Sequence, residues 1–310
     1  MSHSASALDR SIAMPFAGAD IDACEHERDD TTLQSHLNDP NAKAILFDRG
    51  RPALLPEGGL KFVHPRELVG QNLADPGPLY LGKQKGAPIF AFSIESENDL
   101  TEAESFQDMR FVAAKIHPQE LALAGRAKSL LDWHGTHRFC ANCGTMSQTR
   151  NGGISRHCTP CEMDHFPRVN PVTIMLVING NDCLLGRGHG WPAGAFSALA
   201  GFVSPGETIE EGCAREIYEE VGLNVTVPRY IFSQPWPFPS QLMIGLICET
   251  DERELTIDAK EIEDAQWFSK EEVLSVFAKR SDAFRRPPRF TIAHQLLRYW
   301  LDQDDINRSS

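Results

Sequence analysis

The spacing of apolar residues along the chain predicts a succession of strands and helices. Short apolar runs separated by Gly/Pro turns indicate a β-rich region after residue 43, with strands expected at 44–47, 79–81 and 88–92. A helical apolar period follows from Pro118 to Trp133. The run Val172–Ile178 predicts a buried strand, which a turn at 179–182 folds into a hairpin with Cys183–Leu185. Later strands are expected at Tyr230–Phe232 and Leu242–Cys248, and a C-terminal helix at Thr291–Leu301.

These changes of pattern predict four regions. Residues 1–40 are polar with little periodicity and are expected to be flexible, Asp20–Asp30 being loosely ordered at best. Residues 41–136 form a β-rich N-terminal domain, 137–168 a cysteine module and 169–310 an α/β domain in which strands alternate with helices. A chain of 310 residues is long enough for this division.

Composition places the chain among ordinary globular proteins. Hydrophobic residues make up 41% and charged residues 24%. The longest apolar run is too short to cross a membrane, and the N-terminus lacks a basic-then-apolar signal, so a cytoplasmic protein is expected. The net charge of −13 argues against a broad nucleic-acid surface. A polyanionic substrate is still compatible with this charge if divalent cations lie between carboxylates and phosphates.

Four of the eight cysteines form two Cys-x-x-Cys pairs. The pairs are Cys140 with Cys143 and Cys158 with Cys161. Such pairs suit one structural Zn²⁺ per subunit in a ribbon, because four thiolates leave no open coordination position. A redox dithiol would need only one pair. Neighbouring histidines could compete as ligands, although a supporting or surface role is expected for them: His134, His137, His157 and His165.

The segment Gly201–Leu223 predicts a capped helix with an acidic edge. Pro205-Gly206 forms a turn, Thr208 is a plausible N-cap with Glu211 three residues on, and Gly222 stands at a left-handed helix stop. The core-facing residues recur at the helical period: Ile209, Cys213, Ile217 and Val221.

The opposite edge of this helix carries Glu216, Glu219 and Glu220, which crowd one another at helical spacing. Like charges repel there, and only Arg215 is adjacent. Hard divalent cations such as Mg²⁺ or Mn²⁺ would resolve the conflict and could activate a water for attack on a pyrophosphate. The alternative is a solvated acidic helix face.

The whole segment resembles the Nudix box, Gly-x5-Glu-x7-Arg-Glu-U-x-Glu-Glu-x-Gly-U with U apolar, at every position. The resemblance implies an α/β/α sandwich with two or more Mg²⁺ or Mn²⁺ ions per site. It implies that Glu216, Glu219 and Glu220 are metal ligands, and that the Ala200 carbonyl also reaches a metal. Glu207 and Arg215 would brace the loop and helix.

A proline-rich aromatic segment stands downstream, from Ser233 to Met243. Its three prolines alternate with Trp and Phe and predict a stiff loop with ring faces for stacking, or else a packed structural plug. The string resembles the signature of NADH pyrophosphatases (NudC-type) among Nudix hydrolases, except that Gln241 stands in place of Ser. The loop residues that the resemblance implies in substrate binding are Gln234, Pro235, Trp236, Pro237, Phe238, Pro239, Ser240 and Gln241.

The same resemblance implies that Glu261 completes the metal site and that Phe166, Arg110 and Ala293 contact the substrate. It also implies a homodimer. The function expected is hydrolysis of the pyrophosphate bond of NAD(H) to NMN(H) and AMP, with removal of NAD caps from RNA 5′ ends as a related reaction.

Two alternatives stay open at this point. One is a Nudix pyrophosphatase for ADP-ribose or dinucleoside polyphosphates. The other is a non-catalytic module that binds RNA or protein through the ribbon, which local basic residues would favour: Arg138, Arg150, Arg156 and Arg168.

Overall fold

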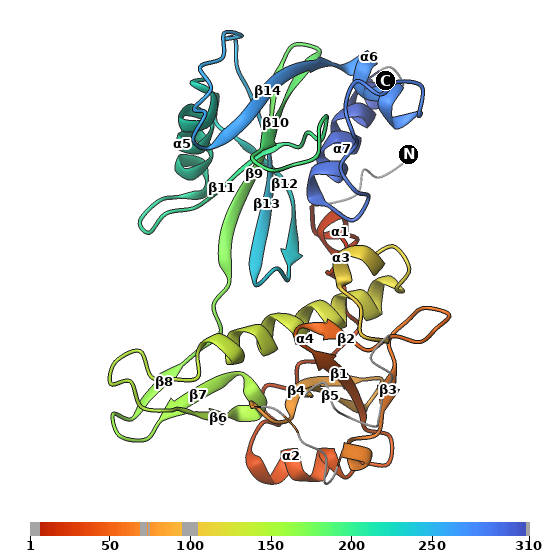
Figure 1. The fold of residues 1–310 in the computed structure, drawn as a ribbon, viewed down its shortest axis with the longest axis vertical. Coiled ribbons are helices and arrows are strands. Elements are labelled where there is room, and N and C mark those ends of the chain that lie inside the picture. The colour runs from red at the N-terminus through yellow and green to blue at the C-terminus, as the bar shows by residue number, and fades with distance from the viewer. Residues whose placement is uncertain (1–6, 69–72, 74, 95–104, 308–310) are drawn as a thin grey trace. The chain divides into compact units, whose positions relative to one another are not determined.

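The computed structural model describes residues 7–307 except 69–72, 74 and 95–104 (Figure 1). The chain divides into two compact units. The first comprises Met1–Met14, Asn170–Gln234 and Leu242–Ser310, and the second Pro15–Val169 and Pro235–Gln241. Within the described residues, no helix is long and apolar enough to cross a membrane.

The first unit contains a six-stranded sheet in the order β12-β13-β9-β10-β14, with β11 paired to β9. The predicted hairpin is confirmed, since β9 pairs antiparallel with β10. Its strands are β9 (Asn170–Asn179), β10 (Asp182–Gly188), β11 (Leu199–Phe202), β12 (Arg229–Trp236), β13 (Gln241–Glu249) and β14 (Ile262–Ser269).

Helices cover both faces of this sheet, which gives the predicted α/β/α sandwich (Figure 1). Helix α5 (Ile209–Val221) buries Cys213, Ile217 and Val221 in one core with Met175 and Leu246. The other face packs against α7 (Ile292–Asn307). There the lack of a side chain at Gly245 admits Ile292 and Leu296, which would lie 3.2 and 3.3 Å from a Cβ. Two further helices belong to the unit, α1 (Ala7–Ile12) and α6 (Lys270–Phe277).

Part of the proline-rich segment, which its sequence predicts to be a stiff loop, is a strand. Strand β12 continues through Pro235 to Trp236, so only residues 237–240 lie between β12 and β13. Because β12 is at the edge of the sheet, a proline there need not cost a ladder hydrogen bond. The sequence pattern also missed β14 and α6.

The second unit begins with a five-stranded mixed sheet in the order β2-β1-β5-β4, with β3 paired to β1. β1 and β5 run parallel, and the other pairs are antiparallel. The three expected strands are confirmed as β1, β4 and β5. The strands are β1 (Lys43–Asp48), β2 (Arg51–Pro52), β3 (Phe62–Val63), β4 (Leu79–Gln84) and β5 (Ala87–Ser93).

Residues 7–40 are not the loosely ordered stretch that the sequence pattern predicts. They include α1 and α2 (Asp30–Leu37), and Phe16 and Cys24 are buried at 3% and 4% exposure. These anchors are too widely spaced to give a helical or alternating pattern, so periodicity could not reveal them. Residues 1–6 lie outside the described residues.

The cysteine module follows helix α4 (Pro118–Thr136) as a three-stranded antiparallel sheet. Its strands are β6 (Gln148–Arg150), β7 (Ser155–Cys158) and β8 (Met163–His165), and the short helix α3 (Met109–Val112) precedes α4. Arg156 is 1% exposed and donates to the Ser147 carbonyl at 2.7 Å. It also lies 3.0 Å from Nδ1 of the buried His134 on α4, which ties the module to that helix.

Candidate active site and zinc centre

Local capping places the acidic helix as the sequence predicts. Thr208 and Glu211 form a capping box, and Gly222 ends α5 with a φ of 74° in the left-handed region. A Cβ at Gly201 on β11 would lie 1.9 Å from Cδ of Glu216. The absence of that Cβ therefore lets the Glu216 side chain lie directly against the strand.

Three carboxylates converge beside α5. Glu216, Glu220 and Glu261 each present an oxygen, and these oxygens all lie within 4.8 Å of one another. Glu220 is 7% exposed, and its Oε2 has no hydrogen-bond partner among the described residues. A buried, unpaired carboxylate oxygen beside two other carboxylates is the donor set that a divalent cation satisfies, so these residues fit the predicted metal site.

Burial and neighbouring negative charges both raise the pKa values of Glu216 and Glu220. Desolvation, followed by the charges of Glu216 and Glu261, raises the pKa of Glu220 to about 8. Desolvation also raises the pKa of Glu216, opposed by a hydrogen bond from Arg215. A bound cation would reverse both effects, because it stabilises the ionised form.

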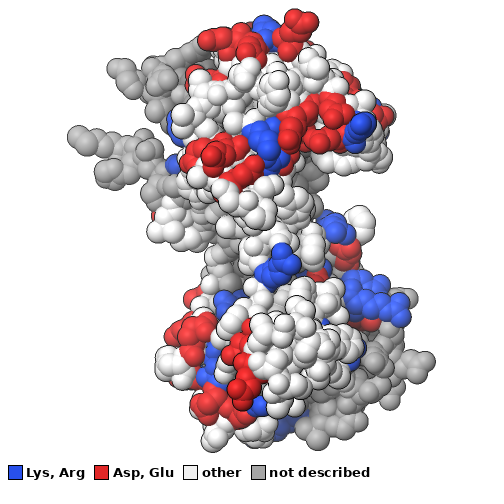
Figure 2. Space-filling model, turned by 90° about the vertical axis from the view of Figure 1, so that its left-hand side faces the viewer, with Lys and Arg blue, Asp and Glu red and all other residues white. Residues whose placement is uncertain are grey.

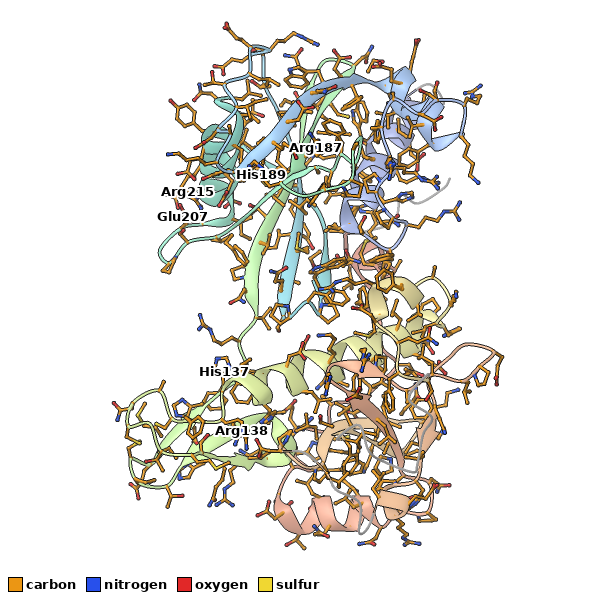
Figure 3. The ribbon with its side chains drawn as sticks, viewed as in Figure 1. His137, Arg138, Arg187, His189, Glu207 and Arg215 are labelled. Atoms are coloured by element: carbon orange, nitrogen blue, oxygen red, sulfur yellow. The ribbon has the colours of Figure 1, made fainter. Side chains whose placement is uncertain are left out.

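Arg215 braces the loop that precedes the helix (Figure 3). Its Nε donates to Oε1 of Glu207 at 2.5 Å, and its Nη2 donates to the Phe202 carbonyl at 3.0 Å. Glu207 also accepts from the Ser204 backbone N–H at 2.8 Å. The hydrogen bonds that Glu207 accepts from Arg215 and from the Ser204 backbone lower its pKa to about 2, the Arg215 bond being the larger cause.

Glu219 lies outside the three-carboxylate cluster. It accepts from Nη1 of Arg215 at 2.8 Å, and its side chain is 47% exposed. Ala200 is exposed on β11, the strand that lies beside Glu216 through Gly201. Metal-ligand roles for Glu219 and the Ala200 carbonyl stay predictions.

Two side chains that the sequence analysis missed hold the segment carrying Glu261. Arg187 on β10 forms an ion pair with Glu263 at 2.9 Å, and Nε2 of His189 lies 3.0 Å from the Ala259 carbonyl (Figure 3). No local motif marks either residue. Their partners lie in β14 or just before it, and the pairing of β10 with β14 brings that distant segment close. Figure 2 shows that Asp and Glu side chains gather on the α5 side of this unit, with single Lys and Arg between them.

The predicted substrate residues fall into both units. In the first unit, Gln234 is fully buried and donates to the Phe290 carbonyl at 2.8 Å, while Ala293 is only 3% exposed within α7. In the second unit, Phe166 is 64% exposed and the Arg110 guanidinium lies 4.3 Å from the Phe238 ring centroid. Their contacts with a substrate stay predictions.

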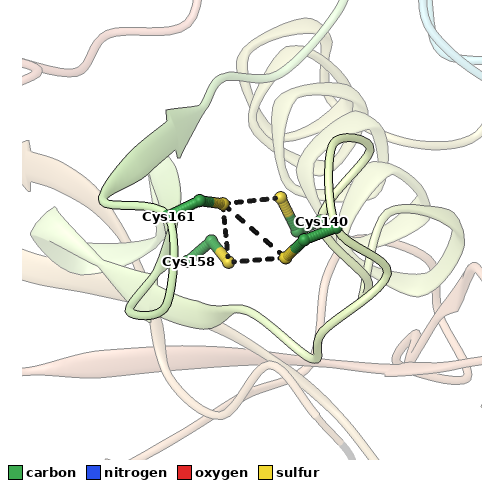
Figure 4. Close-up of side chains that lie close together, drawn as sticks. Cys140, Cys158 and Cys161 are labelled. Carbon is green, nitrogen blue, oxygen red and sulfur yellow. Dashed lines mark hydrogen bonds between the residues drawn. The ribbon is translucent and has the colours of Figure 1, made fainter.

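The four paired cysteines meet in the second unit (Figure 4). Their sulfur atoms all lie within 4.8 Å of one another, and Cys143 and Cys158 are 3.4 Å apart. Backbone N–H groups of Cys143 and Asn142 are among the hydrogen bonds that lower the pKa of Cys140 to about 5, which favours the thiolate that binds zinc. His165 is 3.3 Å from the Cys140 sulfur and supports the cluster from outside.

Family models match three consecutive parts of the chain. The NADH pyrophosphatase-like rudimentary NUDIX domain matches residues 41–133, the NADH pyrophosphatase zinc ribbon domain 136–166 and the NUDIX domain 168–289. The ribbon match and the four converging thiols together support a structural zinc site.

Relatives share much of this sequence. A protein of Chromobacterium violaceum named NAD-capped RNA hydrolase NudC is 34% identical over 249 residues, which cover 79% of this chain and 90% of the relative. The chain belongs to the NudC-type NADH pyrophosphatase family of Nudix hydrolases. A Stutzerimonas stutzeri protein of the same name is 38% identical, with 66% of this chain and 73% of the relative covered.

Human NAD-capped RNA hydrolase NUDT12 is 42% identical over 198 residues, which cover 60% of this Nudix chain. The match spans only 43% of the length of that human relative. The region boundaries predicted at 40, 136 and 168 stay a proposal beside these matches.

Proposed function

We propose that this protein hydrolyses the pyrophosphate bond of NAD(H) with Mg²⁺ or Mn²⁺, giving NMN(H) and AMP, and that it also removes NAD caps from RNA 5′ ends. The observation that carries the proposal is the cluster of Glu216, Glu220 and Glu261, with its unpaired Glu220 oxygen, in a chain of this family. The names of the bacterial relatives support the substrate class.

Different residues of the chain would bind the cations, hold the loop and helix, and recognise the substrate. Glu216, Glu220 and Glu261 would hold the cations, with Glu219 and the Ala200 carbonyl as further ligands. Bound divalent cations neutralise pyrophosphate charge and lower the pKa of an attacking water. Arg215 and Glu207 keep the loop and helix in place, and residues 234–241 recognise the dinucleotide together with Phe166, Arg110 and Ala293.

The reaction is a substitution at phosphorus with no change of oxidation state. The water oxygen forms a bond to one phosphorus, and the bond from that phosphorus to the bridging oxygen breaks. The bridging oxygen leaves with the electron pair on the other phosphate. The nicotinamide therefore keeps the redox form in which it entered.

A parallel assay of four substrates tests this proposal. Purified protein with Mg²⁺, and separately with Mn²⁺, is given NADH, NAD⁺, ADP-ribose and NAD-capped RNA, and AMP or decapped RNA is measured. We expect nicotinamide substrates to be preferred over ADP-ribose. Preference for ADP-ribose would instead identify a different Nudix pyrophosphatase.

Glu220→Gln is expected to lower NADH hydrolysis by at least about a hundredfold, because it removes a cation ligand from a buried position. Glu210→Gln is the matched control, since Glu210 is exposed on the same helix outside the cluster. A Glu220→Gln protein that retained the parental rate would refute the proposed role of the cluster. Homodimerisation and a cytoplasmic location stay predictions, which light scattering and fractionation would check.

A further inference from the structure

The segment Pro235–Gln241 comprises the end of β12, the residues 237–240 and the first residue of β13, and is called the aromatic loop below. It belongs by its contacts to the second unit, although the rest of β12 and β13 lies in the first unit's sheet. Its two rings pack against each other, with the Trp236 and Phe238 centroids 5.0 Å apart. Phe16 contacts both rings edge-on, at 6.0 Å from Trp236 and 5.8 Å from Phe238. Phe16 is itself 3% exposed, so the second unit supplies a buried wall for the loop.

Two cations of the second unit face the Phe238 ring. The Arg110 guanidinium lies 4.3 Å from the ring centroid, and Nζ of Lys128 on α4 lies 5.5 Å from it. The Lys128 side chain is only 14% exposed and also pairs with Asp132 one turn along the helix. A partly desolvated cation over a ring face contributes more than an exposed one, so Lys128 stabilises the position of the Phe238 ring.

Two hydrogen bonds from serine hydroxyls to backbone carbonyls restrain the end of the loop. Ser129 on α4 donates from Oγ to the Pro239 carbonyl at 3.4 Å, and Ser240 donates to the Arg168 carbonyl at 3.0 Å. These two bonds connect the loop to α4 and to Arg168, the last residue of the cysteine module.

Gly125 allows α4 to approach this cluster closely. A Cβ at this position would lie 3.1 Å from Cδ1 of Phe16 and 3.4 Å from Cγ of Pro237. Glycine inside a helix is less favourable than alanine. Gly125 is favourable here because a larger residue would press on Phe16 and Pro237.

We infer that Phe16, Gly125 and Lys128 are positioning residues that set the conformation of the dinucleotide-recognition loop. These three residues of the second unit thereby influence how tightly the substrate binds, without touching the reacting phosphorus. This inference rests on the proposed function, because it assumes that residues 235–241 contact the dinucleotide.

Gly125→Val tests the inference, with Gly135→Val as a matched control on the same helix. A Cβ at Gly135 would meet no atom within 4 Å, whereas one at Gly125 presses on Phe16 and Pro237. Valine is no worse than glycine in helix propensity, so both variants are expected to keep α4. Two quantities are measured for each protein: kcat and KM for NADH, and hydrogen exchange of peptides spanning 229–246.

Gly125→Val is expected to raise the KM for NADH about tenfold while kcat stays within about twofold, since binding is weakened and the chemistry is untouched. Exchange in the loop should become faster. The Gly135→Val protein should match the parent in both measurements. Parental KM and parental exchange in Gly125→Val would overturn the inference, as would equal changes in the two variants.

The exchange measurement separates this inference from the proposed function. If the parent did not hydrolyse NADH, the proposed function would fail, and faster exchange in Gly125→Val alone would still support the positioning of the loop. If Gly125→Val did not fold, Gly125→Ala and Lys128→Met make smaller changes at the same contacts. Parental exchange and parental KM in both of these would likewise overturn the inference.

Discussion

At the scale of single residues, the candidate site depends on one buried carboxylate. Glu220 is crowded by Glu216 and Glu261, and its Oε2 has no hydrogen-bond partner among the residues that the structure describes. The ion pairs of Arg215, by contrast, involve Glu207, Glu216 and Glu219 and leave Glu220 aside. Glu220 is therefore the residue at which folding and cation binding should be most strongly linked.

The raised pKa of Glu220 predicts a pH dependence of stability. Its pKa rises from 4.5 to about 8 on folding, so the folded chain retains a proton that the unfolded chain has lost. Without Mg²⁺ or Mn²⁺, the melting temperature should therefore fall as the pH rises from 4.5 through 8. Glu220→Gln should show a flatter pH profile in calorimetry, and added Mg²⁺ should stabilise the parent more than the variant. Equal pH slopes in both proteins would contradict this explanation, and Glu210→Gln is the control.

A second prediction concerns Gly201. Gly201→Ala places a methyl group where the Glu216 carboxyl now lies, so this carboxyl must move away from its present position in the cluster. We expect Mn²⁺ affinity, measured by calorimetry, to fall about tenfold or more. The control is Gly212→Ala on α5, where a Cβ would meet only ordinary contacts at 3.4 Å and beyond. Unchanged Mn²⁺ affinity in Gly201→Ala would show that the close approach is not required.

At the scale of elements, α5 is defined by its ends. The Thr208 side chain accepts from the Glu211 backbone N–H at 3.1 Å, and Glu211 accepts from the Thr208 N–H at 2.8 Å. The left-handed Gly222 ends the helix two residues after Glu220. The capping residues thus fix which residues are helical, and so which face of α5 carries Glu216 and Glu220.

Thr208→Ala should destabilise the Nudix unit by about 1 kcal/mol, because it removes one half of the capping box. Urea unfolding followed by fluorescence measures the loss. Ser204→Ala removes a hydroxyl from an exposed position in the preceding loop and should leave stability nearly unchanged. Equal stabilities for the two variants would mean that tertiary packing alone holds the start of α5.

At the scale of the whole molecule, the cysteine module and the β-rich N-terminal domain belong to one compact unit. The buried Arg156 connects β7 with His134 on α4 and is also 3.2 Å from Oδ2 of Asp75. The same helix carries Gly125, Lys128 and Ser129 to the aromatic loop. Loss of zinc should therefore affect more than the module itself.

Cys158→Ser is expected to reduce the zinc content from about one ion per chain to a small fraction, because it breaks a closed four-thiolate site. Elemental analysis measures the content, and calorimetry should show earlier melting of the second unit. Cys24→Ala is the control, since Cys24 is buried in the same unit away from the four paired cysteines. Full zinc content in Cys158→Ser would exclude the four-cysteine ligand set.

Elements with strong local signals were predictable from the sequence. The period of α5, its capping box, the β9–β10 hairpin and the two Cys-x-x-Cys pairs are all encoded by residues close together in the chain. The sequence did not predict four features: the ordered structure of residues 7–40, the extension of β12 through Pro235, β14 and α6. The strands and residues 7–40 depend on contacts with distant segments, which periodicity does not record. Helix α6 does carry a local signal, the capping box of Ser269 and Glu272, which could have revealed its start.

The sequence by itself determined the family, the acidic edge of one helix and the four zinc ligands, because each depends on short spacings. The resemblance named the candidate ligands, Glu261 among them, but only the tertiary structure decided which of these carboxylates lie together. It brings Glu261 to Glu216 and Glu220 while Glu219 pairs with Arg215. It also decided that the aromatic loop packs on Phe16 and α4. The physical reason is that these contacts join residues far apart in the chain, and long-range packing sets such distances.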